Sequence, residues 1–327
     1  MKAILFVALF AICLIVANRD IGMFADAENY SEYFYSAASG STINAEPSFI
    51  LIAKFVDFFG LELSALFLIY ALLGVFLKGA FFILKMPDHL HISLLYFTGY
   101  FVTHDLVQIR IGAALGLALW AVFLLGEKKL WLSALLWVFA FTLHFSTLLL
   151  ACVSIILYFA EDTGSTLFNV GRIAFVNLVL ATLLLLASII FDSSFSSLIA
   201  SAFSEMEFIP TRYTENYFVS DEVIGFSKIF YSFSLAFVAL YALRRGMIVG
   251  FAYQHAAVSL TFAALLLIAM KDLPVIGSRL ADIFLFFAPL MVMGIYKKNR
   301  VLGRFIFLSI LAAQLINLIF FSILIYQ

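Results

Sequence analysis

Three ionisable side chains stand in or beside apolar stretches of membrane length, where a charge needs a partner or a functional reason. They are Arg110, His144 and Arg279. A guanidinium stays protonated and presents a planar fork of N–H donors that suits phosphate oxygens. An imidazole can exchange a proton near neutral pH. These residue types indicate chemistry on a phosphate-bearing substrate, with His144 as a candidate base and the two arginines as candidate anion ligands.

Arg110 lies in the stretch 100–125, which is rich in Gly, Ala and Leu but begins with several polar residues. At about 1.5 Å per residue, its guanidinium lies roughly 7 Å along a helix from the polar end, inside the bilayer boundary. It could bind an anion at this depth. Two simpler alternatives are that it snorkels to the interface or pairs with a carboxylate such as Asp105.

His144 interrupts the apolar run 130–160, which is too long for one upright span. We expect two short helices of about 21 and 24 Å, neither able to cross a hydrocarbon core of about 30 Å. Their junction would lie below the outer surface, with His144 at the bottom of a dent. The alternative is one tilted helix in which His144 is hydrogen-bonded inside the bundle.

Arg279 opens a late span in the segment 276–282. Asp282 follows three residues later on the same helix face and could simply neutralise it. Arg110 and Arg279 are far apart in the sequence but are expected at similar depth in the membrane. A single diphosphate bound by both arginines would explain both positions.

The composition indicates the class of protein that must position these residues. Hydrophobic residues make up 65% of the 327 residues and charged residues 12%, and the mean hydropathy is +1.12. Soluble domains carry about twice that charge, so we expect an all-α polytopic integral membrane protein with a single membrane domain over 1–327. The net charge of −1, without a basic run or a Gly-rich phosphate loop, does not suggest nucleic-acid binding. Cys13 and Cys152 are expected to be small core residues.

Apolar segments along the chain predict about eleven transmembrane helices and one shorter helix. Residues 1–17 are expected to form a retained signal anchor, with a cleaved signal peptide as the alternative. Residues 47–60 are too short and too polar for a comfortable span, so we expect an interfacial or re-entrant helix there. The other predicted spans lie near residues 61–84, 90–103, 106–126, 130–143, 146–160, 167–191, 223–243, 250–270, 277–296 and 302–326.

Lysines and arginines orient these spans, because positively charged loops face the cytoplasm. A cytoplasmic N-terminus places most bases inside and most acids outside. Two outer segments, 18–60 and 192–222, then combine acids with aromatic rings, which suits the hydroxyls and C–H faces of sugars. The alternative is an aromatic belt at the membrane interface. The candidate substrate-binding residues on this side are Arg19, Asp26, His104, Asp105, Arg212, Tyr213 and Asp272.

Short motifs along most of the chain resemble the EpsG-like branch of the Wzy-type polysaccharide polymerases. In that family Arg-Gln-Gly-Leu-Ala follows an outer loop, Phe-His-x-Ser-Ala lies two helices later, and an arginine opens a late helix. In this sequence Ile111 stands for the glutamine and Ala113 for the leucine, and the ionisable residues are kept. The motifs that carry the resemblance are Arg19 with Asp26 and Tyr30, Glu46 to Phe49, Gln108 to Ala113, Leu143 to Thr147, and Ser278 to Leu280.

The resemblance implies a GT-C-like, metal-independent glycosyltransferase without a cofactor, in the bacterial inner membrane, with its active site facing the periplasm. Such enzymes move a growing glycan from undecaprenyl diphosphate to the non-reducing end of another undecaprenyl-diphosphate-linked repeat unit, building O-antigen, capsule or exopolysaccharide. A chain-length regulator and a flippase of the same pathway are expected partners. We expect Arg110 and Arg279 to bind the diphosphate and His144 to deprotonate or orient the acceptor hydroxyl. Arg212 is a weaker phosphate ligand and Asp272 a weaker base.

Other functions remain open at the level of sequence. A flippase or other transporter for lipid-linked oligosaccharides would place polar residues at several depths, often in repeated halves, whereas here they cluster on one side. A membrane O-acyltransferase would also use an embedded histidine, but its acyl donor commonly arrives from the cytoplasmic side. An O-antigen ligase would use the same donor with a lipid A-core acceptor, and short motifs do not exclude it.

Overall fold

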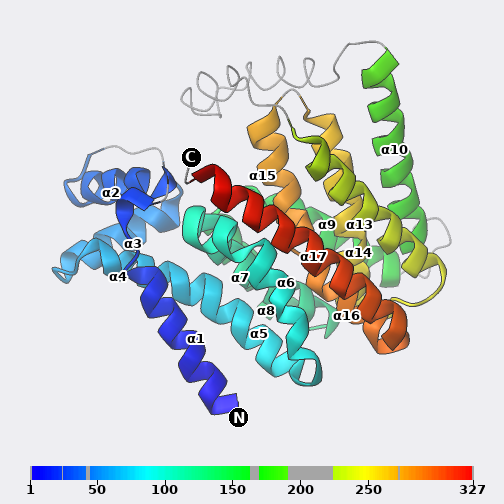
Figure 1. The fold of residues 1–327 in the computed structure, drawn as a ribbon. Helices are drawn as coiled ribbons and strands as arrows, with labels where there is room; N and C mark the ends of the chain where they lie inside the picture. The colour runs from blue at the N-terminus through cyan, green and yellow to red at the C-terminus, as the bar shows by residue number, and fades with distance from the viewer. Residues whose placement is uncertain are drawn as a thin grey trace. The chain divides into compact units, whose positions relative to one another are not determined.

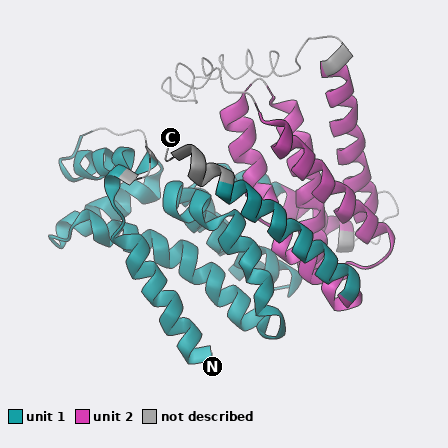
Figure 2. Ribbon diagram, viewed as in Figure 1, with its two compact units in different colours: residues 1–152, 301–327 teal, residues 153–300 magenta. Residues whose placement is uncertain are grey.

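The computed structural model describes residues 2–23, 25–41, 45–162, 169–190, 224–271 and 273–325 (Figure 1). These residues are almost entirely helical, and no strand occurs among them. The chain divides into two compact units, Met1–Cys152 with Val301–Gln327 and Val153–Arg300 (Figure 2). The prediction of an all-α protein is therefore confirmed for the described part of the chain, and the single membrane domain stays a prediction.

The first unit contains most of the short and interrupted helices. Their bounds are α1 (Lys2–Ala17), η1 (Ile21–Met23), α2 (Ala25–Ala38), α3 (Pro47–Phe58), α4 (Leu63–Ala71), η2 (Leu72–Phe76), α5 (Leu77–Lys85), η3 (Pro87–Ser93), α6 (Leu94–Gly99), η4 (Phe101–Val107), α7 (Ile109–Gly126) and α8 (Leu130–Leu143). Most of α17 (Arg300–Ile325) and the start of α9 (Thr147–Asp162) also belong to this unit.

The second unit is built from longer helices. After the rest of α9 it contains α10 (Val170–Ile190), α13 (Phe226–Arg244), α14 (Phe251–Ala269), α15 (Pro274–Leu285) and α16 (Ala288–Lys298). Its buried interior includes polar side chains: the Nε2 atom of His255 lies 2.8 Å from the Ser154 hydroxyl, and the side chain of Asn177 donates to the Thr261 hydroxyl. Such contacts bridge neighbouring helices, because a polar group in an apolar bundle needs a partner.

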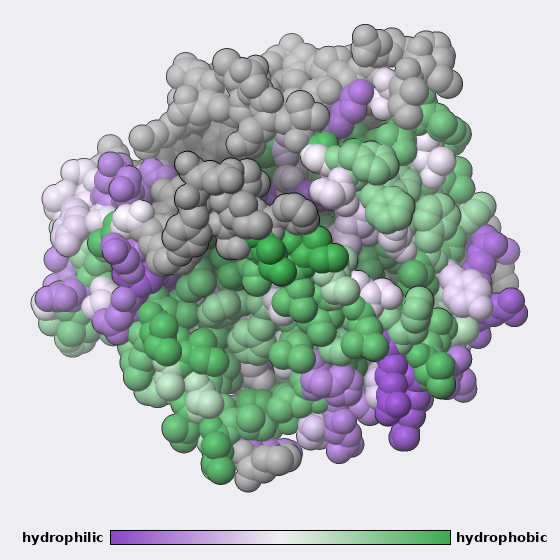
Figure 3. Space-filling view, in the orientation of Figure 1, coloured by the Kyte–Doolittle hydropathy of each residue, from purple (hydrophilic) through white to green (hydrophobic). Residues whose placement is uncertain are grey.

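Seven helical stretches among the described residues are long and apolar enough to cross a membrane. Three shorter apolar helices, α1, α8 and α9, fall below that length. Figure 3 shows hydrophobic side chains over much of the visible face, as contact with lipid requires. The chain is a multi-pass membrane protein; about eleven spans and the GT-C-like class stay predictions. The seven stretches are Leu63–Lys85, Ile109–Gly126, Val170–Ser188, Phe226–Arg244, Phe251–Ala269, Pro274–Lys298 and Arg300–Ile319.

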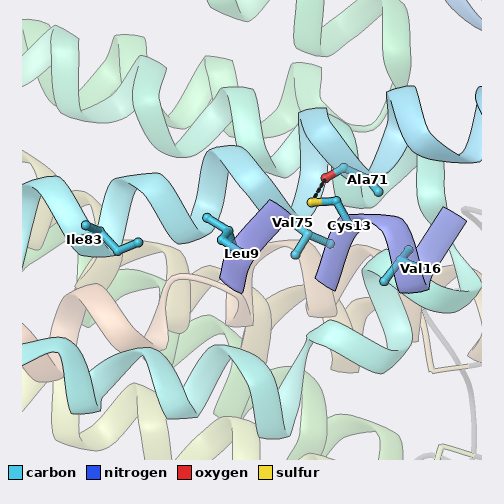
Figure 4. Packing of buried hydrophobic residues seen from close by; sticks show 6 residues of the cluster. All are labelled: Leu9, Cys13, Val16, Ala71, Val75 and Ile83. Carbon is cyan, nitrogen blue, oxygen red and sulfur yellow. Dashed lines mark hydrogen bonds between the residues drawn. The ribbon is translucent and has the colours of Figure 1, made fainter. Parts of the chain in front are cut away.

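Apolar packing fixes α1 against the continuous helical stretch of α4, η2 and α5. Figure 4 shows Leu9, Cys13 and Val16 of α1 against Ala71 and Val75, all of them buried. The Cys13 thiol donates to the Ala71 carbonyl oxygen at 3.5 Å. This contact holds the end of α1, and therefore the residues just after it, beside the polar part of the unit.

Glycines let α7 approach η2 and η4 closely. A Cβ atom on Gly116 would collide with the backbone carbonyl oxygen of Leu73, and one on Gly112 with the carbonyl oxygen of His104. A backbone atom cannot move aside as a flexible side chain can. Close packing therefore requires glycine at these positions of α7. The same packing holds α7, which carries Arg110, against its neighbours.

The polar residues ahead of Arg110 do not continue its helix. α7 begins at Ile109, and the π-helical η4 before it is separated from α7 by Gln108, with φ −97° and ψ 63°. The π-helical segment η4 contains Asp105, which forms a buried ion pair. The Lys78 ammonium donates to both oxygens of Asp105 at 2.8 Å. The stretch 100–125 is therefore not a single helix, because the buried charge of Asp105 must be paired even where this interrupts the helix, whereas the span predicted at 106–126 is confirmed as α7, Ile109–Gly126.

Two further differences from the predicted spans follow the same pattern of interruption. Residues 90–103 fall on three short helical pieces, η3, α6 and η4, rather than on one span. The span predicted at 277–296 is confirmed within the stretch Pro274–Lys298, but the helix is interrupted at Phe286 and Phe287, between α15 and α16. The break predicted around His144 is confirmed, because α8 ends at Leu143 and α9 begins at Thr147.

Candidate functional site

Glu46 joins two of the predicted functional residues in the first unit. One of its carboxylate oxygens, Oε2, pairs with Nη1 of Arg110, and the other, Oε1, lies 2.8 Å from Nδ1 of His144. The Glu46 side chain is 8% exposed, that of Arg110 13% and that of His144 29%. A carboxylate, a guanidinium and an imidazole thus form one contiguous cluster, in which the imidazole is the most accessible group.

Local structure places each member of this cluster at a helix end. Arg110 is in the first turn of α7. Glu46 precedes α3 with an extended backbone, and Pro47 occupies the first helical position, where its missing N–H is not needed. His144 has φ −159° and ψ 117° in the break between α8 and α9. Because all three residues lie at helix ends, side chains from three different segments of the chain meet at one point.

A hydrogen bond between neighbouring segments keeps Glu46 beside His144. The Ser48 hydroxyl, in the first turn of α3, donates to the Thr142 carbonyl oxygen near the end of α8 at 2.6 Å. The His144 carbonyl oxygen in turn accepts the Thr147 hydroxyl at 2.8 Å. Both bonds fix backbone on either side of the cluster, so its geometry does not depend on the ion pair alone.

Aromatic rings surround the guanidinium of Arg110. The rings of Tyr30, Tyr33 and Phe49 have their centres 5.4, 5.9 and 5.9 Å from its central carbon. Aromatic faces attract cations and shield them from water. Arg110 is therefore held by one carboxylate and surrounded by three aromatic rings.

The charges of the cluster change the pKa values of its members outside the transmembrane helices. Burial would raise the pKa of the Glu46 carboxyl, but the hydrogen bond with His144 and the charge of Arg110 outweigh it and lower that pKa below its ordinary value. Burial raises the pKa of Tyr30 to about 12, against the opposing charge of Arg110, and the carboxylates of Asp26 and Glu46 add to the rise. The cluster therefore contains an ionised carboxylate and a neutral phenol.

Arg19 and Asp26, two predicted substrate-binding residues, lie close to the cluster. The Arg19 Nη1 atom donates to the Leu106 carbonyl oxygen at 2.6 Å, and its guanidinium stacks over the Phe67 ring at 4.3 Å. Burial lowers the pKa of Arg19 to about 10. Tyr30 lies within electrostatic range of both Arg19 and Asp26. Two further charged residues, Arg19 and Asp26, therefore lie near Tyr30, one of the rings beside Arg110.

His104 and Asp105 have different surroundings from those the sequence suggested. The His104 ring is fully buried and stacks on Tyr100, with the centres 5.7 Å apart. Asp105 is buried, and it accepts hydrogen bonds from Lys78 and from the Tyr96 hydroxyl. These contacts favour a structural role, and substrate binding by either residue stays a prediction. Asp105 is also not the partner of Arg110, which pairs with Glu46.

Arg279 belongs to the second unit, on α15. Its neighbour Asp282 accepts a hydrogen bond from the Lys228 ammonium at 2.8 Å, so Asp282 has a basic partner on another helix, α13. Joint binding of one diphosphate by Arg110 and Arg279 stays a prediction. Arg212, Tyr213 and Asp272, and with them the outer segment 192–222, lie outside the described residues.

Sequence reasoning missed Glu46 as a site residue, and it missed Lys228 as the partner of Asp282. Glu46 lies within one of the short motifs, directly before a proline at a helix start, and that position was the available signal. Lys228 lies in the first turn of an apolar helix and carried no motif. In the described ranges, no group of three or more His, Cys, Asp or Glu side chains is arranged to hold a metal ion.

Comparison with known proteins adds one finding. A family model described as the EpsG family matches residues 2–327. No curated protein and no solved structure matches the chain. The matched region runs through both units and includes Glu46, Arg110, His144 and Arg279.

Proposed function

The chain belongs to the EpsG family, and on this premise we propose that it is a metal-independent membrane glycosyltransferase that polymerises lipid-linked repeat units. In this proposal the enzyme transfers a growing glycan from undecaprenyl diphosphate to the non-reducing end of another undecaprenyl-diphosphate-linked repeat unit. The transfer takes place on the outer face of the bacterial inner membrane. The product is a polysaccharide of the O-antigen, capsule or exopolysaccharide type.

The observation that carries the proposal is the cluster of Arg110, Glu46 and His144. Arg110 and Glu46 are 64 residues apart in the sequence, and Glu46 and His144 are 98 apart, yet one carboxylate contacts both basic groups. Glycosyl transfer from a lipid diphosphate needs a cation for the leaving group and a base for the acceptor hydroxyl. The cluster contains both groups, each in contact with one oxygen of the Glu46 carboxylate.

Each reacting atom has an assigned partner in this mechanism. The acceptor hydroxyl oxygen attacks the anomeric carbon of the donor sugar and gives its proton to His144. The bond between that carbon and the diphosphate oxygen breaks, and undecaprenyl diphosphate leaves with the bonding electrons. Arg110 stabilises the negative charge that grows on the leaving oxygen, and Arg279 is the second cation proposed for the diphosphate. Charge stabilisation that strengthens in the transition state is the kind that raises kcat.

The test uses purified protein, a synthetic undecaprenyl-diphosphate-linked repeat unit and excess EDTA, with products separated on a gel. We expect the wild-type protein to form a ladder of polymer in EDTA. The variants Arg110→Ala, His144→Ala and Arg279→Ala should each reduce the initial rate by at least about 100-fold, the order of magnitude lost with one charge-stabilising donor. Long polymer from Arg110→Ala or His144→Ala would overturn the assignment of that residue.

Two matched variants separate loss of chemistry from loss of protein. Arg172→Ala removes an exposed arginine at the start of α10, and His91→Ala removes an exposed histidine of η3. Both should retain nearly wild-type rates. If the wild-type protein made no ladder but moved the lipid-linked oligosaccharide across proteoliposomes, the function would be that of a transporter. Transfer only to a lipid A-core acceptor would indicate a ligase.

A further inference from the structure

We propose that Glu46 is a positioning residue that fixes the ring tautomer of His144, so that Nε2 is the nitrogen that accepts the proton of the acceptor hydroxyl. This inference rests on the proposed function for its catalytic consequence, but its structural content can be tested without any activity. Glu46 lies within one of the short sequence motifs, but that motif alone assigned it no role.

The hydrogen bond between Glu46 and His144 decides which nitrogen carries a proton. An ionised carboxylate accepts hydrogen bonds and cannot donate one. Oε1 of Glu46 is 2.8 Å from Nδ1 of His144, an ordinary hydrogen-bond length. Nδ1 must therefore carry the hydrogen. In the neutral ring the lone pair then lies on Nε2, at the far side of the imidazole from Glu46.

The ion pair with Arg110 keeps Glu46 in the ionised state that this assignment needs. Its second oxygen, Oε2, contacts Nη1 of Arg110, and the carboxylate is only 8% exposed. A buried carboxyl between a guanidinium and an N–H donor is stabilised as the anion. Both carboxylate oxygens of Glu46 thus contact a basic group, and the carboxyl group stays ionised.

The backbone around Glu46 fixes the direction of its side chain. The Glu46 carbonyl oxygen accepts the N–H groups of Phe49 and Ile50 at 2.9 and 3.3 Å, which forms the first turn of α3. Pro47 restricts the residue before it to an extended conformation, and Glu46 has φ −60° and ψ 147°. A carboxylate on a rigid helix start orients a base more precisely than one on a long loop.

The same contact serves the proton transfer itself. When Nε2 accepts the hydroxyl proton, the His144 ring becomes a cation that is hydrogen-bonded to the Glu46 carboxylate. An anion at 2.8 Å stabilises that cation as it forms. Glu46 does not touch the substrate in this scheme and takes up no proton. Its effect on the rate passes entirely through His144 and Arg110.

The chain offers a close control for Glu46. Glu62 also precedes a helix, α4 in the same unit, with an extended backbone and without a capping hydrogen bond from its side chain. Unlike Glu46 it is exposed. The substitutions Glu46→Gln and Glu62→Gln therefore remove the same charge from the same local structure, and only one of them changes the partner of His144.

The first measurement is polymerisation kinetics with the synthetic lipid-linked repeat unit. We expect Glu46→Gln to lower kcat by about 100-fold to 10,000-fold, the range of general base catalysis and its orienting group, with KM changed only a few-fold. Glu46→Asp should recover at least about tenfold over Glu46→Gln because it restores the charge. Glu62→Gln should be within about twofold of wild type. Equal kcat values for wild type and Glu46→Gln would overturn the inference while leaving the proposed function intact.

The second measurement is independent of activity. Protein with ¹⁵N-labelled histidine is studied by NMR at about pH 8.5, two units above the ordinary imidazole pKa, and the His144 signals are assigned by their loss in His144→Ala. We expect the wild-type ring to carry its hydrogen on Nδ1, and Glu46→Gln to shift part of the population to Nε2. A hydrogen on Nε2 in the wild type would refute the inference. An Nδ1–H ring in a protein that forms no polymer would uphold the geometry and reject the proposed function.

Discussion

Replacing Lys78 with methionine removes the cation from a fully buried ion pair and should strongly destabilise the first unit. The Lys78 ammonium contacts both oxygens of Asp105 at 2.8 Å, and the two side chains are 0% and 2% exposed. Gly74 and Gly112 line the position of Asp105 so closely that a Cβ atom on either would meet its Oδ1 atom. Asp105 therefore has little room to turn toward water once its partner is gone.

The expected loss follows from what remains around Asp105. The Tyr96 hydroxyl still donates at 2.7 Å, but two charged hydrogen bonds disappear. Removing one partner of a buried pair costs about 3 to 5 kcal/mol, because the other charge stays buried without compensation. The double variant Lys78→Met with Asp105→Leu removes both charges and should recover most of this loss, since apolar residues often replace a buried pair without net destabilisation.

The control is another lysine of the same helical stretch. Lys85 pairs with Glu127 at 3.3 Å, with the side chains 28% and 32% exposed, so Lys85→Met should cost about 0 to 1 kcal/mol. Unfolding by SDS in mixed micelles measures the free energy for the four proteins. Equal destabilisation by Lys78→Met and Lys85→Met would refute the reasoning. Polymerisation by the folded double variant would also contradict the substrate-binding role predicted for Asp105.

Two further predictions concern packing and pH. Gly116→Ala should destabilise the protein by about 1 to 3 kcal/mol, because the new methyl group would collide with the Leu73 carbonyl oxygen, whereas Gly225→Ala meets nothing nearer than 3.6 Å and should cost less than about 1 kcal/mol. SDS unfolding compares the two, and a smaller loss at Gly116 than at Gly225 would contradict the close packing of α7. The pKa of Glu46 is lowered on folding, so its charge stabilises the protein fully above the ordinary glutamate pKa of about 4.3, and this contribution is lost as the pH falls below that value. The difference in unfolding free energy between wild type and Glu46→Gln, measured from neutral pH downward, should therefore shrink in that acidic range; a difference that grew instead would show that the sign is wrong.

The amino-acid sequence by itself determined the class of the protein and several of its elements. Hydrophobicity and charge are sums over many residues, so neighbouring contacts do not change them, and they predicted an all-α membrane protein. The break around His144 was also predictable, because residues 130–160 are too long for one span and polar in the middle. Arg110 was also predictable as a residue of interest, because a charged side chain within an apolar segment needs a partner or a functional role.

Only the tertiary structure decided which charges meet. From sequence, Asp105 was the nearest carboxylate to Arg110, yet it pairs with Lys78, and Arg110 pairs with Glu46 instead. These partners are 27 and 64 residues apart, and Glu46 and His144 are 98 apart. Such pairs depend on how α3, α5, η4, α7 and α8 pack, including the glycines that let α7 approach its neighbours. Helical periodicity relates residues three or four positions apart, whereas an ion pair forms wherever packing brings opposite charges within about 4 Å, so the site itself could not be read from spacing.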